Sequence, residues 1–202
     1  MKPEPSSALA VDDNNSASAI MIASVKANKA AMFILNGLLF QLGWFSAVLG
    51  GNAVALGVML AILMIHQLLF IRHKSEWLFI GLVGVIGIVV DSTLSLSNVL
   101  LFSSTAVGIP TWLFCIWVLF ACTINHSLSW IKDRPLVAIV MGGFAGPSSY
   151  FAGSKLSDVA FAEPLFQSLT IVVIVWAILL PLLMMLSKKI NANDTDDKYA
   201  NE

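Results

Sequence analysis

Asp91 is the first candidate for chemistry, because it is the only acidic residue inside a long apolar run of this sequence. A carboxyl group in such a run could bind a proton or a cation, or it could hydrogen-bond to a neighbouring helix. Gly84 and Gly87 share a helical face with Asp91, so a second helix could approach closely where the carboxyl projects. We favour the hydrogen-bonding role.

Two histidines, His66 and His126, lie near the ends of two other apolar runs. Imidazole titrates near neutral pH and ligates transition metals, and Cys122 lies one helical turn before His126. However, no Cys-x-x-Cys or His-Glu-x-x-His spacing completes a metal site. We therefore predict no metal site, and we expect both histidines to hydrogen-bond between helices.

The sequence also lacks the motifs of known intramembrane enzymes. It contains no His-Glu-x-x-His, no Gly-x-Ser-x-Gly and no Asp-rich cluster that would hold a metal and a phospholipid headgroup. One buried aspartate and two histidines do not readily supply a nucleophile, a base and an oxyanion site together. We predict a protein that is not an enzyme, with no catalytic residues and no cofactor.

The composition shows what kind of elements must position these side chains. Of the 202 residues, 58% are hydrophobic and 11% are charged, whereas roughly a quarter of the residues in a soluble domain are charged. A water-soluble surface cannot be built from this composition, so the bilayer is the expected surrounding. The net charge of -1 gives no basic surface for nucleic acid, and we expect none to bind.

The apolar runs are separated by short breaks, and each is close to the ~20 residues that a helix needs to cross a bilayer. The sequence therefore predicts an all-α bundle of six membrane-spanning helices, at 31–50, 53–71, 77–97, 110–130, 135–153 and 165–187. We expect residues 1–30 to form a disordered or interfacial tail, 31–188 to form the membrane domain, and 189–202 to form a disordered acidic tail.

Basic residues set the orientation, because cytoplasmic loops are enriched in Lys and Arg. With the N-terminus inside, Lys155 alone lies outside, and eight basic residues lie inside: Lys26, Lys29, Arg72, Lys74, Lys132, Arg134, Lys188 and Lys189. The sequence thus predicts a multi-pass inner-membrane protein with both ends in the cytoplasm. Its oligomeric state is not predicted.

This topology sorts the intramembrane polar residues into two layers. The layer near the cytoplasm contains Asn36, His66, Asn125 and His126, with Gln41 a little over a turn deeper. The layer toward the outer side contains Asn52, Asp91, Asn98, Ser148, Ser149 and Tyr150. The first layer is a possible cytoplasm-facing polar pocket.

Two segments of the sequence resemble each other. The pattern His-x-Leu-x-aromatic-Ile-basic begins at His66 and again at His126. A duplicated helical hairpin would produce this similarity. Alternatively, any helix that leaves the membrane on the cytoplasmic side ends in interfacial aromatic and basic residues. This second explanation accounts for the shared pattern except for the two histidines.

Several motifs together resemble an uncharacterised bacterial inner-membrane family, domain of unknown function 2878 (DUF2878). They are Asn36-x-x-x-Phe40-Gln41-x-Gly43-Trp44-Phe45, Gly50-Gly51-Asn52, Glu76-Trp77, Asp91, Pro110-x-Trp112-Leu113, Phe120-Ala121-x-Thr123-x-Asn125-His126-Ser127 and Gly146-Pro147-x-Ser149-Tyr150. The resemblance implies a small polytopic protein of Gram-negative bacteria with no assigned activity or cofactor. Relatives are associated with gene clusters for fatty-acid modification, which implies possible lipid-enzyme or membrane-protein partners.

Two functions therefore stay open. The first is a small permease-like carrier of a small molecule, lipid or proton that uses the two polar layers. The second is a membrane scaffold for partner proteins, in which the polar residues only hold the helices together. An intramembrane enzyme ranks third. The short loops favour the carrier slightly, because a scaffold usually offers more cytoplasmic surface.

Overall fold

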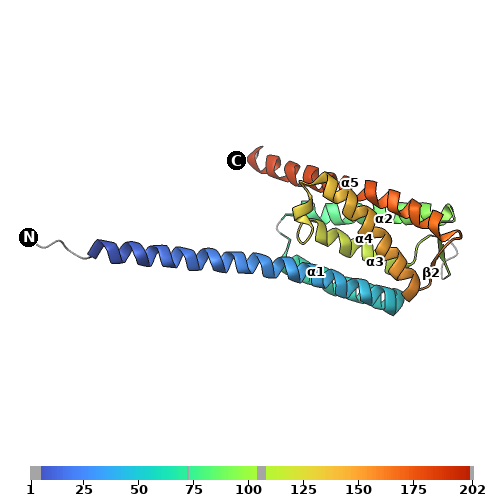
Figure 1. Cartoon of the computed structure of the whole chain (residues 1–202), viewed down its shortest axis with the longest axis horizontal. Coiled ribbons are helices and arrows are strands. Elements are labelled where there is room, and N and C mark those ends of the chain that lie inside the picture. The colour runs from blue at the N-terminus through green and yellow to red at the C-terminus, as the bar shows by residue number, and fades with distance from the viewer. Residues whose placement is uncertain (1–5, 72, 104–107, 201–202) are drawn as a thin grey trace, which may run out of the picture.

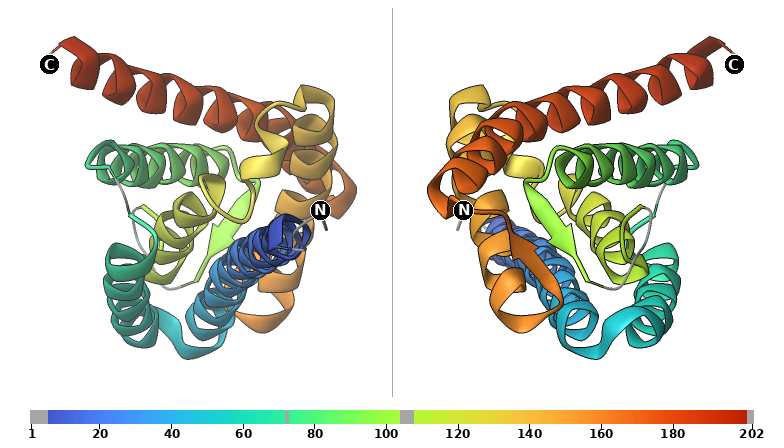
Figure 2. Two further views of the ribbon diagram at one scale, coloured as in Figure 1. Left: turned by 90° about the vertical axis from the view of Figure 1, so that its left-hand side faces the viewer. Right: turned by 90° about the vertical axis from the view of Figure 1, so that its right-hand side faces the viewer.

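The computed structural model describes residues 6–71, 73–103 and 108–200, and it describes side chains between residues 28 and 192 of these ranges. The chain is a bundle of helices, most of which lie nearly along the long axis of the molecule, while α4 (Pro135–Leu156) crosses it obliquely (Figure 1). Figure 2 shows that the helices surround α3 (Thr111–Ile124), which is drawn in yellow-green. The predicted all-α class is confirmed, apart from two strands of three residues each.

The first helix, α1 (Ser6–Leu69), is a helical hairpin with two arms. The arms meet at Gly51, whose φ of 68° and ψ of -167° are not helical and are readily adopted only by glycine. A Cβ at Gly43, in the first arm, would lie 3.0 Å from Ile62 Cδ1 in the second arm. In a straight helix these residues would be ~28 Å apart, so the chain reverses direction at the predicted break.

The remaining helices follow in short succession. They are α2 (Ser75–Leu96), α3 (Thr111–Ile124), the 3-10 turn η1 (Ser129–Ile131), α4 (Pro135–Leu156) and α5 (Leu165–Ala200). By length and composition, four helical segments of the described chain could cross a membrane: Asn28–Leu69, Ser75–Leu96, Pro135–Leu156 and Leu165–Ala192. The shorter helix α3 is also apolar.

The fourth predicted helix is shorter than expected, because α3 ends at Ile124 rather than near residue 130. The Thr123 carbonyl accepts hydrogen bonds from both His126 N, at 3.0 Å, and Leu128 N, at 2.9 Å, which closes the helix with a turn. The sequence analysis did not predict this end, because Leu128, Trp130 and Ile131 continue the apolar character beyond the polar residues 125–127.

The two strands lie between helices at the opposite end of the bundle from the termini (Figure 1). The strands β1 (Leu100–Phe102) and β2 (Val159–Phe161) pair antiparallel, with Leu101 opposite Ala160. They follow α2 and α4, so they tie two connections that are distant in sequence. The sequence analysis did not predict this pairing, because both strands are very short.

Aromatic rings and glycines bring the central helices together. The Trp117 and Trp176 rings stack with centroids 5.1 Å apart, joining α3 to α5. A Cβ at Gly146 would lie 2.9 Å from Trp176 Cβ, and one at Gly142 would lie 3.0 Å from Leu180 Cβ. Contacts this short require glycine, so the small-residue face of α4 explains its close packing against α5.

The helices also extend into the two predicted tails. The first helix begins at Ser6 and α5 continues to Ala200. The side chains of residues 6–27 and 193–200 lie outside the described residues, as do residues 1–5, 201 and 202 entirely. The expected disordered or interfacial tail at 1–30 and the expected disordered tail at 189–202 therefore stay predictions.

Candidate functional site

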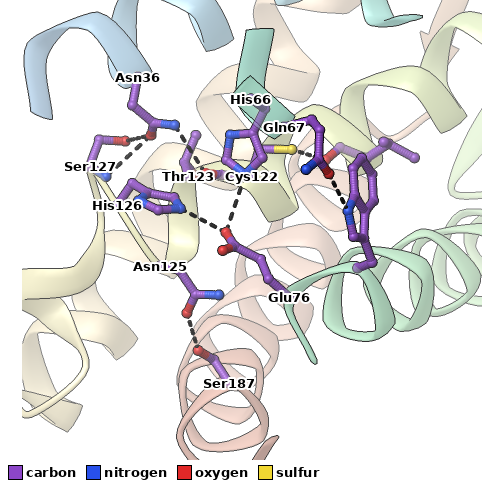
Figure 3. Close-up of polar contacts among 12 residues, drawn as sticks. Asn36, His66, Gln67, Glu76, Cys122, Thr123, Asn125, His126, Ser127 and Ser187 are labelled. Carbon is purple, nitrogen blue, oxygen red and sulfur yellow. Dashed lines mark hydrogen bonds and ion pairs between the residues drawn. The ribbon is translucent and has the colours of Figure 1, made fainter. Parts of the chain in front are cut away.

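Two histidines and a glutamate meet at the end of the bundle where the chain termini leave it. Glu76 Oε1 lies 3.2 Å from His66 Nε2 and 2.7 Å from His126 Nε2. Figure 3 shows both imidazole rings turned toward this carboxylate. The donor atoms of the three side chains all lie within 4.8 Å of one another, which makes this cluster the densest set of metal-ligating groups in the described residues.

Three different elements position this cluster, which we call the His-Glu-His cluster. His66 lies in the last turn of α1, Glu76 in the first turn of α2, and His126 directly after α3. The short connection between α1 and α2 places the first two side chains opposite each other. Phe70 stacks on the His66 ring at a centroid distance of 5.3 Å and also contacts the His126 ring edge-on at 5.1 Å.

Asn36 anchors the turn that carries His126. Its side-chain nitrogen donates to the Cys122 carbonyl at 3.1 Å. Its Oδ1 accepts hydrogen bonds from Ser127 N at 3.2 Å and from Ser127 Oγ at 2.7 Å. These bonds join the first arm of α1 to the end of α3 and satisfy backbone groups that the helix leaves free. The geometry thus gives Asn36 a positioning role.

Asn125 belongs to a separate hydrogen-bond network against α5. Its Oδ1 accepts from Ser187 Oγ at 2.6 Å and from the Lys132 amine. Burial lowers the pKa of the Lys132 amine, because the charged form loses hydration. Of the predicted cytoplasmic layer, the structure therefore brings together the two histidines, whereas Asn36 and Asn125 form neighbouring networks.

A polar cleft opens beside the His-Glu-His cluster. Its volume is about 900 Å³, and Glu76 and His126 form part of its wall. The other lining residues are Asn28, Lys29, Met32, Phe33, Leu69, Phe70, His73, Ser75, Asn125, Ser129 and Asn191. His66 is fully covered, with 1% of its surface exposed. The cleft therefore gives access to the cluster from one side.

Asp91, the outer candidate, is completely buried between three helices. Its Oδ2 accepts a hydrogen bond from Trp117 Nε1 at 2.6 Å, and its Oδ1 accepts one from Tyr150 OH at 2.5 Å. The partners come from α3 and α4, so the carboxyl joins both helices to α2. Gly87 permits this approach, since a Cβ there would overlap the Trp117 ring.

Gln41, Ser148, Ser149 and Tyr150 line an apolar groove of about 910 Å³ between α1 and α4. Of the other predicted outer residues, Asn52 accepts a hydrogen bond from Trp112 N at 3.0 Å and Asn98 is exposed. Across the groove, Trp44 Nε1 donates to Ser149 Oγ at 2.8 Å. Helix α3 and the Trp176 ring form part of its base. The lining is overwhelmingly hydrophobic, so water is a poor occupant.

Glu76 is the site residue that the sequence analysis missed. It lies one residue before the predicted span at 77–97 and was therefore counted outside the membrane. Two signals point to it: an acidic residue in the first turn of a helix, and a pair of histidines in matching sequence patterns without a common partner. Both histidines contact Glu76, which supplies that partner.

A comparison with protein families identifies the chain. Residues 33–182 match the model of a family described as a protein of unknown function, DUF2878. The match covers most of the chain, so the chain belongs to this family and the predicted resemblance is confirmed. No curated protein and no solved structure shows a significant match.

Proposed function

We propose that this DUF2878 protein is a six-span protein of the bacterial inner membrane that binds and carries a lipid-like molecule. The observation that supports this most strongly is the apolar groove between α1 and α4, next to a polar cleft. The proposal combines a topology, a binding surface and a ligand class.

The lengths of the helices support the proposal of six spans. The segment Asn28–Leu69 has 42 residues, about 63 Å of helix, which is twice the ~30 Å hydrocarbon thickness. Since this segment is a hairpin turned at Gly51, each arm can cross once. Helices α2, α4 and α5 are each long enough to cross once. Helix α3 has 14 residues, about 21 Å of helix, so we propose that it makes the remaining crossing together with its flanking segments. Both termini leave the same end of the bundle (Figure 1), as an even number of crossings requires, and the basic residues favour the cytoplasm for that end.

The groove has the properties of a site for an acyl chain. Its walls are helices that face the hydrocarbon, so a lipid could enter sideways without crossing water. Exposed apolar residues such as Leu38, Phe45 and Phe144 line it. Ligand sites of this kind are mostly apolar, with a few polar groups that set orientation.

Polar groups adjoin the groove at two places, which favours an amphipathic occupant over a plain hydrocarbon. Phe33 lines both the groove and the polar cleft, so the two spaces adjoin at the cytoplasmic end. At the second place, Trp44 Nε1 donates to Ser149 Oγ at 2.8 Å across the groove. A hydroxyl such as that of Ser149 is the kind of group that hydrogen-bonds to a carbonyl or ester oxygen.

Two other functions remain as alternatives. A scaffold for lipid-modifying enzymes would bind its partners on the outer helix faces and leave the groove without a ligand. An intramembrane enzyme would need reacting groups along the groove. We propose a carrier without catalysis. Co-purification of a partner enzyme in mild detergent, with no lipid in the groove, would favour the scaffold instead.

Photo-cross-linking tests the proposal. Membranes that contain the protein are incubated with a diazirine-labelled fatty acid or phospholipid, irradiated and analysed by peptide mass spectrometry. We expect adducts on groove residues of α1, α3 and α4. Ala145→Trp fills the groove and should reduce labelling at least ~10-fold. The control Ala61→Trp changes an exposed residue of α1 outside the groove and should leave labelling unchanged. Equal labelling of both variants, or labelling spread evenly over the lipid-facing helices, would refute the groove as a binding site.

A further inference from the structure

We propose that the His-Glu-His cluster binds one divalent transition-metal ion, through His66 Nε2, His126 Nε2 and a carboxylate oxygen of Glu76. This inference is independent of the lipid groove. It starts from three side chains that are distant in sequence or separated by a turn and that nevertheless direct their ligand atoms to one point.

The distances in the cluster are close to those of a metal site. Ligands about 2.1 Å from a zinc ion at tetrahedral angles lie ~3.4 Å from one another. In the structure the two nitrogen-to-oxygen separations are 3.2 Å and 2.7 Å, and the two imidazole nitrogens are no more than 4.8 Å apart. Small side-chain rotations therefore suffice to place an ion between the three atoms.

The donor types select the class of ion. Two imidazoles and one carboxylate suit Zn²⁺, Fe²⁺ or Co²⁺, whereas Mg²⁺ and Ca²⁺ prefer oxygen ligands throughout. Cys122 lies nearby in sequence, but its Sγ donates to the Val118 carbonyl at 3.4 Å and does not belong to the cluster. The set thus resembles the facial arrangement of two histidines and one carboxylate that leaves positions open on the metal.

Access and support also fit an ion. Glu76 and His126 line the polar cleft, so an ion can reach them and water or an anionic group can fill the open positions. On the other side, His66 is buried against Phe70, and Asn36 holds the turn at Ser127 beside His126. Such supporting contacts keep ligands in place before the ion arrives.

A plain hydrogen-bonded cluster is the competing interpretation, in which both imidazoles donate to Glu76 and no ion enters. The two interpretations differ in metal binding. The full-length protein is purified in detergent through a Strep-tag, stripped with a chelator, and titrated with Zn²⁺ by calorimetry and with Co²⁺ by absorption. We expect one Zn²⁺ per chain and no comparable binding of Mg²⁺.

Variants locate the ion. Glu76→Gln and His126→Ala each remove a ligand and should raise the Zn²⁺ Kd by more than ~100-fold, beyond the 10- to 100-fold effect of losing a supporting contact. The matched control is His73→Ala, because His73 lines the same cleft but lies outside the cluster. It should bind Zn²⁺ like the wild type.

A further variant provides a spectroscopic test if Glu76→Gln and His126→Ala fail to fold. His126→Cys replaces one ligand with a thiolate, so its Co²⁺ complex should gain a thiolate-to-cobalt charge-transfer band that the wild type lacks. The absence of stoichiometric Zn²⁺ binding to the folded wild type would overturn the proposal. It would also be overturned if His73→Ala raised the Zn²⁺ Kd as much as His126→Ala does. A Co²⁺ complex of His126→Cys without the charge-transfer band would overturn it as well.

Discussion

Gly87→Ala should destabilise the bundle strongly, because Gly87 lies directly under the Trp117 ring. A Cβ at this position would lie 2.6 Å from Trp117 Cδ1 and closer still to two other ring atoms, whereas carbon atoms in contact are normally 3.5–4.0 Å apart. The rigid indole must therefore move by ~1 Å or more. Its Nε1 then leaves Asp91 Oδ2, to which it is now 2.6 Å away. Overpacking costs about 1–3 kcal/mol, and the lost hydrogen bond about 1.5–3 kcal/mol, so we expect the free energy of unfolding to fall by about 2.5–6 kcal/mol.

The assay uses the only two cysteines of the chain, Cys115 and Cys122, which are both free and buried. Their reaction with a thiol-reactive fluorogenic dye reports unfolding during an SDS titration. Gly81→Ala is the matched control on the same helix, because a Cβ there has nothing within 4 Å, and alanine should be neutral or stabilise by up to ~1 kcal/mol. If Gly87→Ala unfolds at the same SDS concentration as Gly81→Ala, the packing argument for α2 against α3 is wrong.

Other predictions follow from single contacts. Asp91→Asn can still accept a hydrogen bond from Trp117 Nε1 and donate one to the Tyr150 oxygen, so it should lower stability by only about 1 kcal/mol in the same SDS titration. Asp91→Leu leaves both donors without an acceptor and should lower stability by about 2–5 kcal/mol. Equal losses of stability would contradict the hydrogen-bonding role. Asn36→Ala should lower stability by about 2–4 kcal/mol, since it removes three interhelical hydrogen bonds, and an unchanged SDS midpoint would count against it. A membrane-impermeant maleimide applied to intact cells should label Lys155→Cys and spare Lys74→Cys, both of which replace exposed residues; the reverse pattern would invert the proposed orientation.

The helices could be predicted from the sequence because long apolar runs have few alternatives in a bilayer. The Gly50-Gly51-Asn52 break correctly placed the turn of the α1 hairpin. The end of α3 could not be predicted, since it depends on Asn36, which lies 91 positions before its partner Ser127. Hydropathy carries no information about such a long-range hydrogen bond.

The sequence predicted only part of the candidate site. Depth along the predicted spans placed His66 and His126 in one layer, because both lie near the ends of their predicted spans. Glu76 appeared only in the family motif Glu76-Trp77 and was not predicted as their common partner, since it lies just before a predicted span. Which residues of this layer share a pocket depends on side-chain direction, which depth alone cannot specify. In the structure Asn125 lines the polar cleft with His126, whereas Asn36 bonds to Ser127 outside the cleft lining.

Genetic complementation tests the carrier proposal most directly. In a strain that lacks the gene, membrane and whole-cell lipids are profiled by mass spectrometry before and after expression of the wild type, Ala145→Trp or Ala61→Trp, with immunoblots to match protein levels. The proposal predicts that the deletion changes the level of particular lipids and that the wild type and Ala61→Trp restore them, whereas Ala145→Trp, with its groove filled, does not. Full restoration by Ala145→Trp would contradict it.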